Sequence, residues 1–580
     1  MKLSWVLIKL GFILFMTALT QATYLIQSNA LSFCQDKSNL TISYFSMTFT
    51  PNNRSVSISF DGTTEISGNV TAEISLFVYG YKALSTTLDP CESGYKAFCP
   101  MSAGSINLAH TSIILSGSTV SQIPSIGYLV PDLDITVRVY VSSTKTGEVI
   151  SCVEGALSNG KTVYQQGVGW TTAILAGLGL LASGVASARG HSASTTRLAA
   201  ATLPLLGFMQ TQASFGMVAV HMPPIVESWT QNFQWTMGII YVGSVETICT
   251  WYQRATGGTP STTLSDLSRW KKRSIAGAFA RRASESSISS IATVRGIERV
   301  GFQANIERTN IFLTTISFFA FFVFAVFLLL AIFRAYYESV AIRRKLRRDI
   351  VSAYRRDWRV LVKRNVLRLL SLGFFPVCIL CPWEMQQQDS SAEIILAVLV
   401  FLFMLGMLGS AAVGFVLLTK EQSSLSRRRV AYIFSSNPFY SSDWVFLFMS
   451  TWRAASFFVA ADLAYLLCKG MVIGLSQPTA VAQAVFLLIL EVVQIIVLCR
   501  LRPWSDKKLK RFSITLATIR MVDAIFLLVF TGVFSQPAMM TSIMGVIYVL
   551  YNAIMAIILL LNLLIASWHA MRSKDGPSTR

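Results

Sequence analysis

The C-terminal half of the chain alternates long apolar runs with short polar loops. The run from Asn310 to Phe333 contains no ionisable side chain. At about 1.5 Å rise per residue, a helix of this length exceeds the roughly 30 Å thickness of a bilayer's hydrocarbon core. Comparable runs lie at 168–188, 198–220, 365–383, 393–418, 444–467, 479–499, 513–534 and 540–567. The pattern predicts a polytopic α-helical membrane protein with about nine spans.

The loops between these runs are sorted by charge. The basic set comprises 189–197, 334–364, 419–443, 500–512 and the tail 569–580. The opposite set, 384–392, 468–478 and 535–539, contains a single basic residue, Lys469. Because Lys and Arg beside short loops are retained on the cytosolic side, we expect a cytosolic C-terminus. With nine spans, the N-terminal region is then lumenal or extracellular.

Residues 23–160 show a different period. Apolar and polar residues alternate, as in Val56, Ile58 and Phe60 and along the runs 70–78 and 135–141, with turn residues between the runs. This pattern predicts short strands in an all-β sandwich. An apolar stretch at residues 1–22, flanked by Lys2 and ending in small residues, predicts a cleaved signal peptide before it.

The exported region has the chemistry of a secreted domain. Its four cysteines, Cys34, Cys91, Cys99 and Cys152, predict two disulfides, of which three connectivities are open. Asn39, Asn53 and Asn69 begin glycosylation sequons. The chain carries a net charge of +20, but residues 23–160 hold six Lys and Arg against ten Asp and Glu. The positive charge therefore belongs to the membrane half, where it serves topology and anionic lipids rather than nucleic acid.

Four ionisable residues inside the predicted spans are candidates for function: Arg453, Glu491, Arg520 and Asp523. Charges in a membrane are costly and face a pore, a cavity or one another. The four form either a transport path or a structural charge network, and Arg520 and Asp523, three apart, can pair on one helix face. Asp462, nine residues after Arg453, is expected on a different surface.

Other segments favour plain structural roles. Gly177 and Gly179 lie in a span rich in small residues, which predicts close helix packing. The basic segment 334–368 has apolar residues at intervals of three and four, which predicts an amphipathic helix on the inner leaflet. Its candidate contacts to anionic lipids are Arg343, Arg344, Lys345, Arg347, Arg348, Arg355 and Arg356. Met237–Trp251 is short and contains Glu246, so it is expected to be interfacial or re-entrant. The four histidines are scattered, and no metal site is expected.

Several strings are specific enough to indicate a family. They include Gly68-Asn69-Val70-Thr71-Ala72-Glu73, Val130-Pro131-Asp132-Leu133-Asp134, Ser228-Trp229-Thr230-Gln231-Asn232-Phe233-Gln234-Trp235 and Arg295-Gly296-Ile297-Glu298-Arg299. They resemble the fungal flavin carrier family, and the later spans resemble its TRP-like membrane domain through weaker motifs. The resemblance implies a lumenal ML-like domain at 23–160, two first transmembrane helices within 168–220, a junction loop at 221–308, a TRP-like domain at 309–568 and a cytosolic tail at 569–580.

The resemblance implies two functions, and a third reading stays open. Members are described as carriers of FAD into the endoplasmic reticulum lumen, linked to cell-wall maintenance, and as TRP-like calcium-permeable channels. The third is a lipid-sensing scaffold that conducts nothing, with a lipid between the sheets of the ML-like domain. None needs catalysis or a covalent cofactor. We expect membrane lipids as partners, a homo-oligomer as an option, and a secretory-pathway membrane: the endoplasmic reticulum, with the plasma membrane and vacuole as alternatives.

The loop charges generate a direct test of topology. Glycosylation tags inserted at Ser390 and Gln536 should be modified, because both loops are expected on the lumenal side. Tags near Ser424 and Ser505 should stay unmodified, as judged by the electrophoretic shift on deglycosylation. Modification at Ser424 would contradict the nine-span arrangement.

Overall fold

The structure is a computed structural model that describes residues 26–572 with several gaps. The gaps are 29–30, 34–39, 51–52, 90, 92–99, 115–129, 133, 145–146, 189–191, 263, 265–294, 344–347, 422–451 and 502–506. The predicted signal peptide, Cys34, Cys99, Asn39, Arg344, Lys345 and Arg347 therefore lie outside the described residues. The same holds for the side chains of Arg343, Arg348, Arg355, Arg356 and Arg453.

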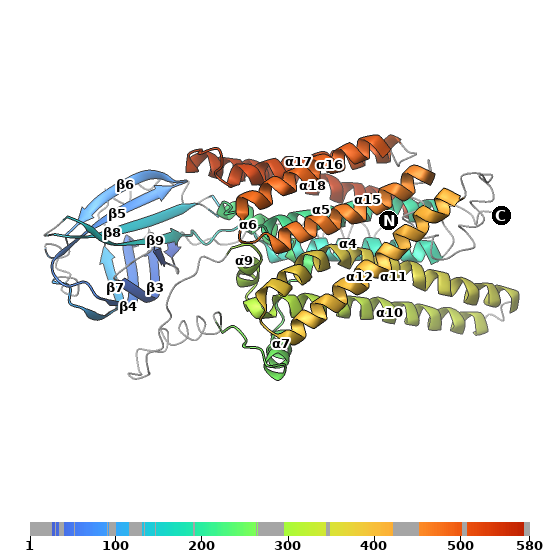
Figure 1. The fold of residues 1–580 in the computed structure, drawn as a ribbon, viewed down its shortest axis with the longest axis horizontal. Helices are drawn as coiled ribbons and strands as arrows, with labels where there is room; N and C mark the ends of the chain where they lie inside the picture. Colours follow the sequence, from blue (N-terminus) through green and yellow to red (C-terminus); the bar gives the residue numbers. More distant parts are fainter. Residues whose placement is uncertain are drawn as a thin grey trace.

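The N-terminal region forms two antiparallel sheets, drawn in blue at one end of the molecule (Figure 1). One has the order β1 (Ile26–Ser28), β3 (Leu40–Thr50), β4 (Ser55–Thr64), β7 (Gly104–Ile114). The other has the order β2 (Leu31–Phe33), β9 (Val149–Leu157), β8 (Ile135–Ser143), β5 (Val70–Val78), β6 (Tyr81–Leu88). The alternating runs are strands, as their period predicts.

Local sequence fixes the register of the second sheet. Tyr79 and Gly80 join β5 to β6, with φ of 51° and 72°. Positive φ at both central residues is the geometry of the tight hairpin turn that matches strand twist, and glycine adopts it without steric cost. On the other side of β5, Leu76 pairs with Val137. The apolar positions of β5 and β8 therefore share one face.

Two of the three predicted glycosylation sites and two of the four cysteines lie in the described part of this region, and glycosylation stays a prediction. Asn53 and Asn69 are exposed. Cys91 and Cys152 are both disulfide-bonded, and Cys152 is buried. The connectivity and the lipid between the sheets stay predictions.

Asp132 and Asp134 anchor the β region to the helices. Asp132 Oδ2 accepts hydrogen bonds from the Val163 N–H at 2.6 Å and the Thr162 hydroxyl at 3.1 Å. Burial raises the pKa of Asp132 in spite of these bonds. Ser542 donates to Asp134 Oδ2 at 3.0 Å. The connection to the first helix is thus held by side chains on both sides of the domain boundary.

The rest of the described chain is helical. The first helices are α4 (Gln166–Ala188), α5 (Ser192–Gly216), α6 (Pro224–Gln231), η3 (Gln234–Met237), α7 (Gly243–Ala255), α9 (Gly296–Gln303) and η4 (Arg308–Asn310). The later ones are α10 (Ile311–Arg343), α11 (Arg348–Gln387), α12 (Ser391–Glu421), α15 (Trp452–Leu475), α16 (Ala480–Leu501), α17 (Lys507–Phe530) and α18 (Ala538–Arg572). The long helices run side by side along the molecule (Figure 1).

Seven segments of the described chain are long and apolar enough to cross a membrane. They are Arg308–Tyr336, Asn365–Gln387, Ser391–Gly414, Phe457–Leu475, Ala480–Leu501, Arg511–Phe530 and Met539–Trp568. They correspond to seven of the nine predicted spans. The other two predicted spans form α4 and α5, and their crossing stays a prediction.

Helix α5 lies in the core of the helical part. Glycines allow close approach between α4 and α5 and between α15 and α11. Leu205, Met209 and Ala213 of α5 are fully buried, and α5 packs on α4 and α18. A Cβ on Gly179 of α4 would meet Thr202 Oγ1 at 2.8 Å, so the small-residue run does mark close packing. Gly474 of α15 likewise lies against α11, because a Cβ there would clash with the Ile379 carbonyl oxygen.

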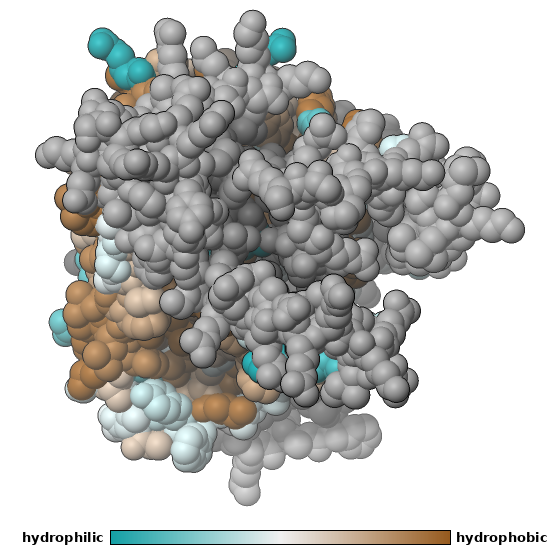
Figure 2. Space-filling model, turned by 90° about the vertical axis from the view of Figure 1, so that its right-hand side faces the viewer, coloured by the Kyte–Doolittle hydropathy of each residue, from teal (hydrophilic) through white to brown (hydrophobic). Residues whose placement is uncertain are grey.

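Large apolar side chains cover the outside of the helical part. Phe321, Phe324 and Phe327 of α10 are exposed, as are many apolar residues of α12, α16 and α18. Figure 2, which views the molecule from the end where α10 and α11 protrude, shows apolar surface along one flank. A surface this apolar is incompatible with water and suits lipid chains.

The prediction of a separate amphipathic helix at 334–368 is wrong. Helix α10 continues to Arg343, and α11 begins at Arg348 and continues into the next span. A helix that extends a span without a break cannot lie flat on the membrane. The segment contains no Gly or Pro and many good helix formers, so the helices continue past the apolar run. The proposed lipid contacts of its basic residues stay untested.

The junction loop also contains more structure than its sequence suggested. Within it, Arg299 of α9 binds Glu227 of α6 at 2.7 Å and the Gly216 carbonyl at 2.9 Å. Helix α7 has 13 residues, too few to cross a bilayer. Its exposed Ile248 and Trp251 are consistent with the interfacial placement expected for this segment.

We expect Cys152→Ser to destabilise the β region by about 2–4 kcal/mol, because a cross-link restricts the unfolded chain. One new thiol should become alkylatable in the denatured, non-reduced protein, as counted by mass spectrometry. Cys468→Ser, at an exposed free cysteine, is the control and should release none. Wild-type stability of Cys152→Ser without a new thiol would contradict this prediction.

Candidate functional site

Helices α15, α16 and α17 bring a buried ion pair into the membrane domain. Lys469 Nζ of α15 lies 2.6 Å from Glu491 Oε1 of α16. The Tyr465 hydroxyl donates to the same oxygen at 2.6 Å. Arg520 of α17 places its Nε 3.4 Å from Glu491 Oε2. Glu491 therefore holds together three helices, and two cations compensate its charge.

Helical phase explains why these side chains converge. Asp462, Tyr465 and Lys469 are spaced by three and four residues, so they share one face of α15. Glu491 and Gln494 likewise share one face of α16. Gln494 Nε2 donates to Asp462 Oδ1 at 3.1 Å. Two contacts at different depths thus join the polar faces of α15 and α16.

These faces border a cavity of about 250 Å³ between α5, α11, α15, α16 and α17. Its charged lining residues are Asp462, Lys469 and Arg520, and polar ones include Gln210, Thr211 and Gln494. Two cations and two anions, counting Glu491, make the cluster formally neutral. A neutral set costs much less to hold in a membrane than an unbalanced one.

Arg520 is incompletely satisfied. Its Nε and Glu491 Oε2 are buried atoms without a hydrogen-bond partner among the described residues, because their 3.4 Å approach does not have hydrogen-bond geometry. The guanidinium lies over the Tyr465 ring, 5.5 Å from its centroid. The ion pair between Arg520 and Glu491 therefore lacks a direct hydrogen bond through Nε.

Asp523 belongs to a second polar network. Its Oδ2 accepts from Gln212 Nε2 at 3.0 Å and its Oδ1 from Asn552 Nδ2 at 2.9 Å. Gln212 Oε1 in turn accepts from the Tyr548 hydroxyl and from Trp229 Nε1. All five side chains are buried. This network ties α5, α6, α17 and α18 together through bonds that use both Asp523 oxygens.

The four candidate residues predicted from the sequence therefore do not form one cluster. Glu491 and Arg520 come together as expected. Asp523 does not join them, and no local pair between Arg520 and Asp523 forms among the described side chains. The side chain of Arg453 lies outside the described residues. Asp462 borders the same cavity as Arg520, and its expected separation from Arg453 stays a prediction.

Sequence reasoning missed Lys469 because it read residues 468–478 as a loop. In the structure α15 continues to Leu475, and the Lys469 side chain is only 9% exposed. The predicted loop began directly before Lys469, because a charge after an apolar run was taken as the end of the span. The three-and-four spacing of Asp462, Tyr465 and Lys469 was the signal that could have shown one continuous polar face.

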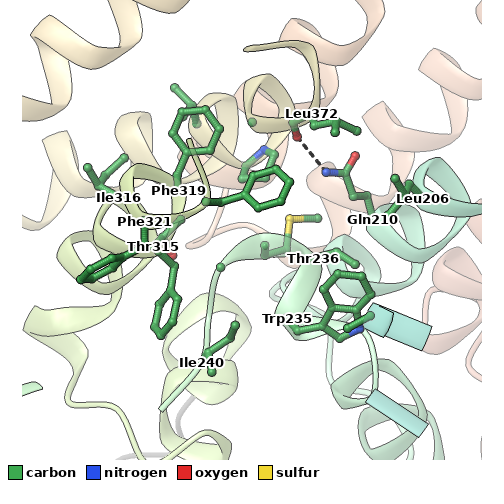
Figure 3. Close-up of a pocket in the computed structure, with 18 of the residues that line it drawn as sticks. Leu206, Gln210, Trp235, Thr236, Ile240, Thr315, Ile316, Phe319, Phe321 and Leu372 are labelled. Carbon is green, nitrogen blue, oxygen red and sulfur yellow. Dashed lines mark hydrogen bonds between the residues drawn. The ribbon is translucent and has the colours of Figure 1, made fainter. Parts of the chain in front are cut away.

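A second, apolar cavity of about 450 Å³ lies between α4, α5, η3, α10 and α11 (Figure 3). Phe319 and Phe321 of α10, Trp235 of η3 and Leu206 of α5 surround it. The Trp235 indole nitrogen and the Thr315 hydroxyl are buried without a hydrogen-bond partner among the described residues. An apolar space with a few polar atoms is suited to an amphipathic molecule.

Gln210 and Leu372 line both cavities. Gln210 Nε2 donates to the Leu372 carbonyl at 2.9 Å, the bond drawn dashed in Figure 3. This hydrogen bond between α5 and α11 therefore lies where the charged cavity and the apolar one approach each other.

Both parts of the chain match known protein families. Residues 168–580 match the model of the transient receptor potential (TRP) ion channel family, and residues 26–163 match that of the ML-like domain. The chain is 34% identical over 563 residues to flavin carrier protein 2 of Saccharomyces cerevisiae, covering 92% of this chain and 72% of that protein. It is 29% identical over 564 residues to flavin carrier protein 1 of the same yeast, covering 95% and 70%. The TRP-like ion channel pkd2 of Schizosaccharomyces pombe is 30% identical over 571 residues, covering 96% and 80%.

Removing the Glu491 charge should unbalance the cluster. We expect Glu491→Gln to lower the stability of the membrane domain by about 3–5 kcal/mol, because Lys469 and Arg520 then lack compensation. The double variant Lys469→Met with Glu491→Gln leaves Arg520 facing Asp462 and should recover most of that loss. The measurement is the thermal unfolding midpoint of the purified protein in detergent.

Glu338→Gln is the matched control for this cycle. Glu338 pairs with Arg334 on the same helix at 3.2 Å and is one-third exposed, so its loss should cost at most about 0.5 kcal/mol. Equal midpoints for the wild type, Glu491→Gln and the double variant would show that the pair has no structural role.

Proposed function

The chain belongs to the TRP ion channel family with an N-terminal ML-like domain, and from this premise we propose that it is a flavin-carrier-like transporter that moves FAD into the endoplasmic reticulum lumen. The resemblance to flavin carriers noted in the sequence is confirmed at the level of family. The family consists of membrane transport proteins rather than enzymes. FAD, the compartment and a link to cell-wall maintenance are parts of the proposal.

The observation that carries the proposal is the Arg520 guanidinium in the lining of the charged cavity. FAD contains an anionic pyrophosphate, and a planar guanidinium binds phosphate oxygens with charge-assisted hydrogen bonds. Lys469 adds a second cation on the same wall. A phosphate could compete with Glu491 for these cations, so binding would be coupled to the contacts between α15, α16 and α17.

The size of the cavity implies a conformational change. At about 250 Å³, it is smaller than the roughly 300–1,000 Å³ typical of sites for drug-sized ligands. Breaking the Gln210–Leu372 bond would add the apolar cavity, where the isoalloxazine ring could stack among aromatic side chains. Transport would then require α5 and α11 to move apart.

A TRP-like calcium-permeable channel regulated by lipid is the second candidate. The family model and the similarity to the fission yeast TRP-like channel favour it. In that case Asp462 and Glu491 would face the ion, and a lipid in the apolar cavity would control the packing of α5 on α11. A non-conducting lipid-sensing scaffold would use the same cavity without transport.

The full chain reconstituted in liposomes, assayed in parallel for FAD uptake and Ca²⁺ flux, distinguishes these functions. We expect FAD uptake, and we expect Arg520→Gln to reduce it about ten- to a hundredfold at equal protein content, since a charge-assisted hydrogen bond contributes about 1.5–3 kcal/mol. Arg520→Lys should recover part of the uptake. Arg254→Gln, at an exposed position of α7, is the control and should behave as wild type. Ca²⁺ flux without FAD uptake would overturn the carrier in favour of the channel, and neither activity would favour the scaffold.

A further inference from the structure

The apolar cavity between α4, α5, η3, α10 and α11 has no charged side chain among the described residues that line it. Its volume of about 450 Å³ lies within the roughly 300–1,000 Å³ typical of sites for drug-sized ligands. FAD would reach this space only after α5 and α11 have moved apart. A charged group would be buried here without compensation, so the closed cavity suits an uncharged ligand.

The cavity lies in the half of the helical part that is nearer to the β region (Figure 1). Along α10, which begins at Ile311 beside that region, the lining residues run from Thr315 to Phe322. At about 1.5 Å rise per residue, they lie roughly 6 to 17 Å from the start of the helix. This depth corresponds to one leaflet of a bilayer whose hydrocarbon core is about 30 Å thick.

Two polar groups at the shallow end of the cavity have no partner. The Thr315 side chain is 3% exposed, and neither its hydroxyl nor the Trp235 indole nitrogen has a hydrogen-bond partner among the described residues. The two residues are neighbours in space. Gly238 donates its N–H to the Trp235 carbonyl at 3.1 Å, and a Cβ on Gly238 would meet the Thr315 carbonyl oxygen at 3.2 Å. A ligand hydroxyl at this end would satisfy a buried group that is otherwise unpaired.

The walls of the cavity suit a flat, rigid molecule. Helix α4 contributes Ala173, Ala176 and Gly177, whose side chains are at most a methyl group. A Cβ on Gly177 would meet nothing within 4 Å, so the space in front of α4 is open. Helix α10 contributes aromatic rings, among them Phe319 (Figure 3). A rigid ring system loses little conformational freedom on binding to such surfaces, whereas flexible acyl chains lose more.

The cavity opens toward the lipid. Phe321 and Phe322 line it and are nevertheless 61% and 42% exposed on the apolar outside of α10. A ligand would therefore enter sideways from the bilayer and not from water.

We propose that this cavity binds one membrane sterol. Its hydroxyl would bond to Thr315, and its fused rings would lie against the small residues of α4 and the phenylalanines of α10. A phospholipid or a fatty acid would bring a charge that the lining does not compensate. Diacylglycerol has an uncharged hydroxyl but flexible chains, and competition distinguishes it from a sterol. The inference does not rest on the proposed function, because occupancy is measured without FAD and without Ca²⁺.

Photolabelling of the full-length chain tests the proposal. The protein is reconstituted in phosphatidylcholine liposomes that contain a photoreactive, alkyne-bearing cholesterol analogue, and labelled peptides are identified by mass spectrometry. We expect saturable labelling of the α4 and α10 segments that line the cavity. Unlabelled cholesterol should displace the probe, and dioleoylglycerol at the same mole fraction should not.

Filling the cavity should abolish this labelling. Gly177→Leu places its side chain in the open space and should reduce labelling by at least about tenfold, because it takes the volume of the ligand. Gly406→Leu is the matched control, since Gly406 is an exposed glycine of α12 with equally open surroundings. It should label as wild type.

Removing the hydroxyl should weaken binding without filling the cavity. Thr315→Val should raise the cholesterol concentration needed for displacement roughly two- to tenfold, the effect of one hydrogen bond. Thr314→Val, which removes a neighbouring buried hydroxyl outside the lining, should not raise it.

Three results would overturn the proposal. The first is wild-type labelling that cholesterol does not displace, which would show contact with bulk lipid only. The second is equal displacement by dioleoylglycerol, which would replace the sterol by a general neutral lipid. The third is undiminished labelling of α4 and α10 in Gly177→Leu.

Discussion

The membrane domain depends on the compensation of charges that lipid cannot solvate. Glu491 is the clearest case, because it lies between Lys469 and Arg520 on two other helices. In a medium without water, an uncompensated ion is so unfavourable that any rotation of α15, α16 or α17 that separates Glu491 from both cations is disfavoured. The apolar faces of these helices would tolerate several registers. The charged faces therefore select the arrangement from which the cavity results.

Three polar clusters differ in how completely their buried hydrogen-bonding groups are paired. The Asp523 network uses both carboxylate oxygens and joins four helices with direct hydrogen bonds. Such a network rigidifies its surroundings and leaves nothing for a ligand. The Glu491 cluster is balanced in charge but leaves Arg520 Nε and Glu491 Oε2 without bonds. The carboxyl groups of Glu384 and Glu393 are fully buried, and their oxygens have no partner in good hydrogen-bond geometry among the described residues. Of the three, the Glu491 cluster is the one that borders a cavity described above.

The position of the two cavities indicates where the helices could move apart. Helix α5 separates the charged cavity from the apolar one and also contributes Gln212 to the rigid network. Its residue Gln212 is bonded to α17 and α18, while beside the cavities Gln210 bonds to the Leu372 carbonyl of α11. The contact between α5 and α11 is where a path could open. The ML-like region touches the far end of the same assembly through Asp134 and Ser542, so a ligand there could influence the helices.

The chain's local patterns determined its class, and tertiary contacts decided its sites. Apolar run length predicted the spans and period two predicted the strands, because both depend on neighbours in sequence. Glu491 and Arg520 were recognisable as candidates because any charge within a span is costly. Lys469 and Glu384 were misread as loop residues, because a charge that finds a buried partner does not end a helix, and the partner is not visible in the local sequence. Asp523 was assigned to Arg520 by proximity along one helix, yet its partners Gln212 and Asn552 come from α5 and α18. Which polar groups meet depends on helix rotation and packing, and only the folded structure specifies these.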